Sequence, residues 1–149
     1  MITRLRTRRG AITIESAFVF PVVAFLILAL VVGAVGIFRY QEVCYLAHEA
    51  ARYAAVHGTD YAKEQNQPAA TAQEIYDKAV KPRLMVLDPA RVGYAVSWDQ
   101  SNAPVRVVSD YERPVYNTVT VTVTYSWLPE LYLVGPITLR GKSTLPMSY

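Results

Sequence analysis

Apolar residues dominate one long stretch near the start of the chain. No charged side chain occurs between Glu15 and Arg39, so the apolar run covers residues 16–38. At ~1.5 Å of rise per residue, a helix of these ~23 residues is ~34 Å long, which is enough to cross the hydrocarbon core of a bilayer. A helix also satisfies its own backbone hydrogen bonds, as lipid requires. The pattern therefore predicts a membrane-spanning helix.

After this run the apolar residues recur at spacings of three and four, which is the period of a helix with one buried face. We therefore expect one helix of about 45 residues, from Ala11 to a stop near Gly58. Its apolar stripe consists of Val43, Leu46, Ala47, Ala50, Ala51 and Ala54, while Gln41, Glu42, Glu49 and Arg52 fall on other faces.

A loop and a second helix are predicted next. Residues 59–70 are polar and have no period, which is typical of a loop. Thr71, with Glu74 three places later, forms a capping-box pattern that indicates a helix start. Ile75, Ala79 and Val80 give this second helix an apolar face.

The period changes to two after Pro89, as expected for strands with one buried face. Thr118–Trp127 alternates strictly, Val92–Trp98 alternates with small residues, and residues 137–147 alternate less regularly. A weaker run at residues 105–108 predicts a short extra strand. Because a sheet face and a helix stripe bury one another, we predict an α+β fold, with the long helix packed on a small antiparallel sheet of about three strands.

Positive charge is concentrated at the N-terminus. The chain has 15 Lys and Arg against 12 Asp and Glu, and Arg4, Arg6, Arg8 and Arg9 all precede the apolar run. Without them the chain has 11 basic and 12 acidic residues, which argues against nucleic acid as a partner. Arginines that flank a first span stay cytoplasmic, so we expect a cytoplasmic N-terminus and an extracytoplasmic C-terminal domain.

The junction between the arginines and the apolar run has a characteristic form. Gly10 follows an arginine, Glu15 lies five positions past the glycine, and Pro21 lies six positions past the glutamate. This string resembles the start of the TadE-like minor pilins (pseudopilins) of tight-adherence type IVb pilus systems. Residues 44–58 are similar to the Ala/Arg-rich helix that follows the span in these proteins. Ser16, where many members carry an aromatic residue, fits the minor pilins better than the major ones.

The resemblance implies a minor pilin or pseudopilin, a structural component or assembly factor of such a pilus or of a related secretion system. A prepilin peptidase would cut between Gly10 and Ala11, which leaves Glu15 as the fifth residue of the mature chain. The implied partners are this peptidase, other pilins, the inner-membrane pilus assembly platform and membrane lipid. The implied location is the cytoplasmic (inner) membrane, with a single span, and after assembly a surface pilus.

On this interpretation residues 1–10 are a disordered cytoplasmic leader, residues 11–38 the transmembrane helix and residues 39–149 an extracytoplasmic domain. Two alternatives stay open. An ordinary secretory signal cut after Ala34 would release a secreted enzyme, although such signals have shorter apolar cores of ~7–15 residues. An uncleaved single-pass anchor would instead carry an extracytoplasmic binding module. Prepilin processing alone accounts for the positions of both Gly10 and Glu15.

Glu15 is the predicted functional residue. A carboxylate inside the apolar zone costs ~2.5–3.5 kcal/mol on insertion scales, so its presence there favours a role in subunit assembly. The alternative is a polar side chain at the level of the lipid headgroups.

Residues that carry catalytic or metal chemistry are few. His48 and His57 are the only histidines, and no nucleophile elbow, phosphate-binding glycine loop or dinucleotide motif occurs. Cys44 and His48 are four residues apart, but a structural zinc needs four ligands. We therefore predict no enzyme activity, no metal and no cofactor. Cys44, the only cysteine, is expected to be a small packed residue, with an intermolecular disulfide as the alternative.

Tyrosine is abundant, with 11 residues. Tyrosines on the alternating strand faces are expected to pack in the sheet, where aromatic residues are favoured. Tyr132, in the connection before the last strand, is the better candidate for an exposed contact surface, since tyrosine is enriched at interfaces.

Overall fold

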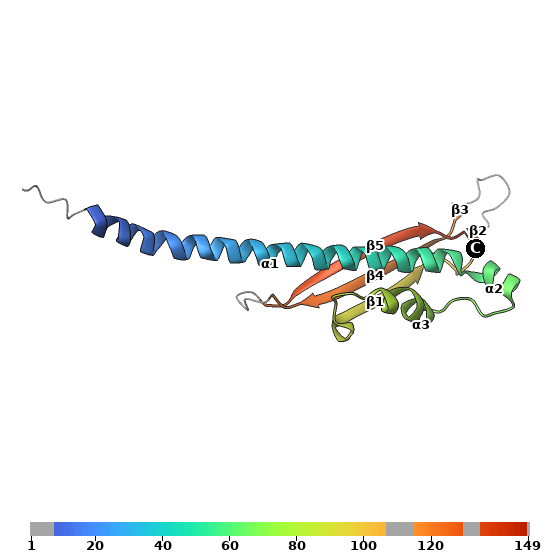
Figure 1. Ribbon diagram of the computed structural model, residues 1–149. Coiled ribbons are helices and arrows are strands. Elements are labelled where there is room, and N and C mark those ends of the chain that lie inside the picture. Colours follow the sequence, from blue (N-terminus) through green and yellow to red (C-terminus); the bar gives the residue numbers. More distant parts are fainter. Residues whose placement is uncertain (1–7, 107–114, 130–134, 149) are drawn as a thin grey trace, which may run out of the picture. The chain divides into compact units, whose positions relative to one another are not determined.

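The computed structural model describes residues 8–106, 115–129 and 135–148. The chain forms two compact units, Met1–Gly36 and Ile37–Tyr149. One helix, α1 (Arg8–Val56), contributes to both units (Figure 1).

In the first unit, α1 presents its apolar side chains to the outside. The exposed fraction is 75% for Phe18 and Phe20 and 74% for Leu30. The helix continues through Pro21, which removes one backbone hydrogen bond without ending the helix. By length and composition α1 is able to cross a membrane. It begins at Arg8, so the predicted start at Ala11 was three residues late. The predicted disorder of residues 1–10 is wrong for residues 8–10, which are helical, and residues 1–7 lie outside the described residues.

In the second unit, the last part of α1 supplies one half of the core. The predicted stripe is confirmed, because all six of its side chains are at most 1% exposed: Val43, Leu46, Ala47, Ala50, Ala51 and Ala54. The helix ends at Val56, two residues before the predicted stop. Gly58 does not have the left-handed conformation of a helix C-cap glycine, since its φ is −80° and it is the N-cap of the next helix.

A three-stranded antiparallel sheet supplies the other half of the core. Its strand order is β1-β4-β5, so β4 is the central strand (Figure 1). Buried and more exposed residues alternate along β4, as its sequence predicts, with the valines, Tyr125 and Trp127 buried. The strands are β1 (Val92–Trp98), β4 (Thr118–Trp127) and β5 (Ile137–Pro146), which confirms the three predicted strands.

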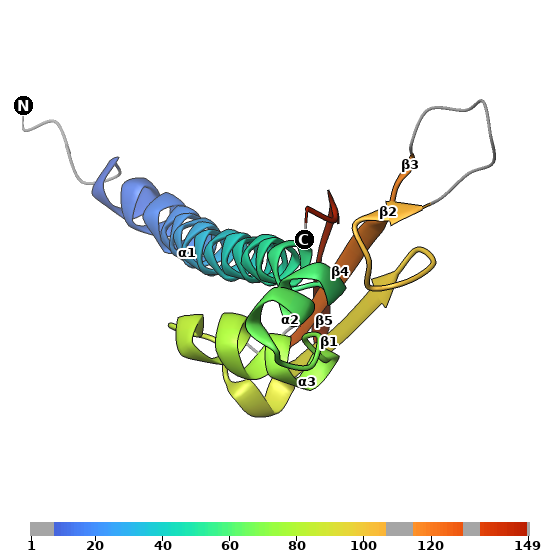
Figure 2. The same ribbon diagram turned by 90° about the vertical axis from the view of Figure 1, so that its right-hand side faces the viewer.

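One row of residues across the sheet shows which elements cover it. Tyr94, Val123 and Gly141 lie opposite one another in β1, β4 and β5. The Tyr94 ring contacts the Tyr76 ring, with centroids 5.5 Å apart, and the backbone at Gly141 lies directly against α1. The long helix and the second helical segment therefore cover the same face of the sheet (Figure 2). The α+β fold is confirmed.

The second helical segment starts as predicted. The Thr71 hydroxyl accepts a hydrogen bond from the Glu74 N–H at 3.3 Å, and Ile75, Ala79 and Val80 are buried. The segment changes its helical form along its length, from α3 (Ala72–Ile75) to the π-helix η1 (Tyr76–Val80) and the 3₁₀-helix η2 (Lys81–Arg83).

The loop predicted over residues 59–70 is wrong in its first part, whereas residues 66–70 are irregular as expected. Residues 59–65 form the helix α2 (Thr59–Gln65), which ends at Asn66 in the left-handed conformation, with φ 52°. Its sequence lacks a helical period because only Ala62 is buried, so the polar residues gave no sign of it. The predicted extra strand is present as β2 and its remaining residues, 107 and 108, lie outside the described part. The further short elements are η3 (Pro89–Arg91), β2 (Val105–Arg106) and β3 (Val115–Tyr116).

Candidate functional site

The predicted cleavage site lies in the first turn of α1. Gly10 and Ala11 follow the start of the helix at Arg8, so their backbone is helical. A peptidase that cuts between them needs this turn to unwind. Glycine favours that step, because it is about 1 kcal/mol less favourable than alanine inside a helix. Arg4 and Arg6 lie outside the described residues, whereas Arg8 and Arg9 lie in the helix backbone.

Glu15 is an exposed carboxylate on an apolar helix surface. Together with Ser16, Val19, Phe20 and Val23 it lines a shallow hollow of about 490 Å³ along one face of α1. It lies four residues, or about one helical turn and ~6 Å, from Ala11. A single acidic group on such a face can pair with a cation of a neighbouring helix.

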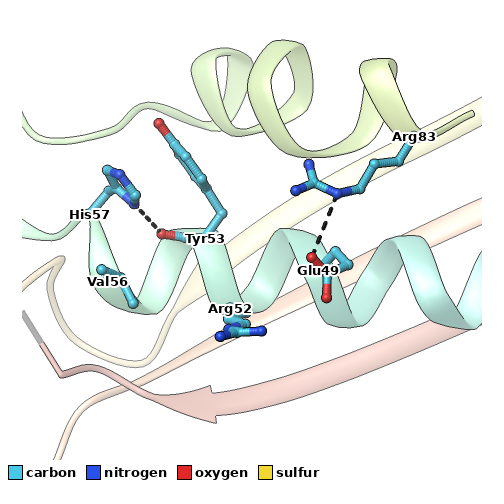
Figure 3. Close-up of a pocket in the computed structure, with 6 residues that line it drawn as sticks. All are labelled: Glu49, Arg52, Tyr53, Val56, His57 and Arg83. Carbon is cyan, nitrogen blue, oxygen red and sulfur yellow. Dashed lines mark hydrogen bonds and ion pairs between the residues drawn. The ribbon is translucent and has the colours of Figure 1, made fainter.

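A second, more polar groove lies in the unit that contains the sheet. Figure 3 shows its side chains: four come from the last turns of α1, His57 directly follows that helix, and Arg83 lies in η2. The groove has a volume of about 340 Å³, and its lining residues are Glu49, Arg52, Tyr53, Val56, His57 and Arg83.

The polar groups of this groove are largely paired, and one ion pair joins η2 to α1. Arg83 Nε lies 3.6 Å from Glu49 Oε2, and Arg83 Nη1 donates to the Ala79 carbonyl at 3.1 Å. His57 Nδ1 lies 2.9 Å from the Tyr53 carbonyl oxygen, and the two rings stack with centroids 3.8 Å apart (Figure 3). These contacts account for the groove as a packing feature of the fold.

Glu42 is buried, although the sequence pattern placed it on an exposed face of the helix. It was expected on a face away from the stripe, yet its side chain is only 6% exposed. Glu42 Oε1 accepts hydrogen bonds from the Met85 N–H at 2.8 Å and from the Val86 N–H at 3.2 Å. Through these two hydrogen bonds, the buried carboxylate fixes the segment between η2 and η3 against α1. Its partners lie more than forty residues away, so no local spacing indicates them.

The remaining candidate residues are scattered. Cys44 is a free, half-buried thiol, and His48 is exposed. The described residues contain no group of three or more His, Cys, Asp or Glu side chains able to hold a metal ion. Tyr125 is buried and Tyr94 half-buried, as their strand positions predict, whereas Tyr116 is 58% exposed. Tyr132 lies outside the described residues.

Comparison with known proteins gives one match. The model of the TadE-like protein family matches residues 10–52, which begin at the predicted cleavage glycine and include Glu15, Pro21 and most of the buried stripe. The match confirms the resemblance inferred from the residues around Gly10 and associates the chain with the pilin-like proteins of tight-adherence systems. It covers less than a third of the chain, and the whole sheet lies outside it. No curated protein and no solved structure matches the chain.

Proposed function

We propose that the chain is a minor pilin or pseudopilin of a tight-adherence pilus or a related secretion system, and that a prepilin peptidase cuts it after Gly10. The observation that carries this proposal is the family match that starts at Gly10 and follows α1 through its apolar run. The exposed apolar side chains of the first unit support anchoring by a single span, since large exposed apolar surfaces indicate a membrane or a partner.

The arginines support an N-terminus on the cytoplasmic side of the inner membrane. Four arginines precede the span, whereas Arg39 is the first charged residue after it. Basic residues next to a first span remain in the cytoplasm, which sends the sheet-containing unit to the other side.

Glu15 gives the proposal its mechanism. Cleavage after Gly10 creates an α-amino group on Ala11, which is cationic near neutral pH because its reference pKa is ~7.7–8.0. Each of these two charges is unfavourable in lipid when alone, and pairing offsets much of that cost. Two processed chains, displaced along their axes by about one helical turn, bring the amine of one to the carboxylate of the other. The pair would set the register of neighbouring subunits.

The processing step is tested by mass. The full chain is expressed with and without a prepilin peptidase, extracted from membranes and weighed by mass spectrometry. The wild type should lose residues 1–10, and Gly10→Leu should keep them, because a leucine side chain obstructs the extended backbone that a peptidase binds. Gly33→Leu is the matched control, since a side chain at Gly33 meets nothing within 4 Å. An unshortened wild-type chain would favour the uncleaved anchor and overturn the proposal.

The assembly step is tested by recovery of partners. Glu15→Gln keeps the shape of the side chain and removes its charge. This variant should be cleaved and remain in the membrane, yet fail to co-purify with the other pilins. Glu64→Gln, on the exposed surface of α2, is the control and should assemble normally. Normal recovery of partners with Glu15→Gln would leave Glu15 as a headgroup-level side chain.

A further inference from the structure

An exposed apolar surface lies at the start of the second unit, where the chain leaves the apolar run. Its four large side chains are Phe38 and Tyr45 on α1 and Met85 and Val86 in the segment between η2 and η3, and we call them the helix–loop patch. Their exposed fractions are 54% for Phe38, 45% for Tyr45, 75% for Met85 and 53% for Val86. Phe38, Tyr45 and Met85, with Gln41 and Glu42, line a groove of about 180 Å³.

Contacts on both sides of Met85 and Val86 keep these two side chains exposed. Glu42 accepts hydrogen bonds from the backbone N–H groups of both Met85 and Val86, which holds this segment against α1. Leu87, the next residue, is only 4% exposed and fixes the segment in the core from its other end. A buried carboxylate thus orders a segment whose two apolar side chains face outward.

The position of the patch along the chain matches the outer headgroup layer of a bilayer. The apolar run of residues 16–38 spans ~34 Å as a helix, a few Å more than the ~30 Å hydrocarbon core. Glu42, which holds the loop, lies four residues beyond Phe38, a further ~6 Å along the axis. The headgroup layer extends roughly 5–7 Å past the core on each side. When Phe38, the last residue of the run, lies at the outer edge of the hydrocarbon core, Glu42 and the loop that it holds fall within this layer.

We propose that the helix–loop patch rests in the outer headgroup layer and contacts lipid there. Its composition fits that environment, because aromatic side chains are enriched where a span meets the headgroups and flexible methionine adapts to irregular apolar surroundings. Glu42 does not oppose this contact, since the residue is only 6% exposed and its Oε1 accepts from two backbone N–H groups. The loop then acts as a second membrane contact of the sheet-containing unit, in addition to the helix.

This inference rests on the anchoring part of the proposed function, and does not depend on cleavage or pilus assembly. Its test places a nitroxide label at one position of the full chain in a Cys44→Ala background, so that the native thiol is not labelled. The labelled positions are Met85→Cys in the patch, Val56→Cys at the far end of α1, and Leu30→Cys inside the span. The protein is reconstituted in phosphatidylethanolamine–phosphatidylglycerol vesicles, and the label's accessibility to oxygen is compared with its accessibility to a water-soluble nickel chelate.

We expect the oxygen-to-nickel accessibility ratio at position 85 to be several-fold higher than at position 56, and highest at position 30. A ratio at position 85 equal to that at position 56, with position 30 in lipid, would place the patch in water and overturn the inference alone. A ratio at position 30 as low as at position 56 would overturn membrane anchoring and the inference together. Spectral broadening at position 85 that disappears on dilution with unlabelled chain would show that a second copy covers the patch, which also contradicts lipid contact.

Discussion

The contact between β5 and α1 leaves no room for a side chain at Gly141. A Cβ atom added there would lie 2.7 Å from the Val43 carbonyl oxygen and 2.9 Å from the Cys44 Cα. Real Cβ atoms essentially never approach other atoms this closely. Both neighbours are backbone atoms of a helix, which cannot rotate away. We predict that Gly141→Ala forces the sheet and the helix apart.

The expected loss of stability follows from two opposing effects. Inserting a methyl group into a well-packed core typically costs about 1–3 kcal/mol. Replacing glycine by alanine restricts the unfolded chain, which returns about 0.4–1 kcal/mol where the backbone conformation is compatible. Gly141 does not have a positive φ, so backbone strain adds nothing. Because the obstructing atoms are backbone, we expect the packing cost to dominate, with a net loss of about 1–2 kcal/mol.

The assay is thermal unfolding of the full chain in detergent, followed by circular dichroism in the β-sheet region. For a domain of about 110 residues, a loss of 1–2 kcal/mol lowers Tm by about 4–8 °C. Gly93→Ala is the matched control, since it makes the same change in the same sheet, but its Cβ would meet the Thr124 hydroxyl, the end of a side chain that can rotate. This control should shift Tm little. An unchanged Tm for Gly141→Ala, or equal losses at both positions, would refute the packing explanation.

Three further predictions concern buried groups and topology. Glu42→Ala removes the acceptor of the Met85 and Val86 N–H groups, so hydrogen exchange at these two amides should accelerate, while Glu42→Gln, which keeps an acceptor oxygen, should retain more of the protection. Unchanged exchange in Glu42→Ala would contradict the role of the carboxylate. Burial raises the pKa of Tyr94 above its ordinary value of 10.0, so the unfolded chain ionises first and stability should fall as pH rises past about 10. Tyr94→Phe should weaken this loss and leave stability at neutral pH unchanged or higher, because the hydroxyl has no hydrogen-bond partner among the described residues; an identical alkaline profile would rule Tyr94 out as its source. A reporter enzyme active only in the cytoplasm, fused after Tyr149, should be silent, and strong activity would reverse the proposed orientation.

The elements that depend on hydrophobic period were predictable from the sequence. The last part of α1 and the strand β4 each bury one face, so the spacing of their apolar residues indicates which side chains are buried. The strand β5, which alternates less regularly, was also predicted, but the sequence did not explain why its alternation is irregular. The reason is Gly141, which faces the helix at a position where any side chain collides with backbone.

The features that the sequence did not reveal depend on contacts between distant residues. Glu42 has the spacing of a surface residue, and only the approach of Met85 and Val86 makes it a buried acceptor. The short helix α2 buries a single alanine, so it has no apolar period to detect. Unlike Glu42 and α2, the predicted site residues Gly10 and Glu15 belong to a short local motif. For that reason the sequence indicated them directly.

The two halves of the core in the second unit are synthesised at different times. α1 ends at Val56, whereas β5 ends about 90 residues later, a separation that lasts roughly 5–18 s at ~5–20 residues per second. During this time the stripe on α1 has no sheet to cover it. Four of its six residues are alanines, which expose only one methyl group each. Before the sheet is made, the helix therefore exposes little apolar surface. It is less prone to aggregate than a helix with a leucine-rich stripe of the same length.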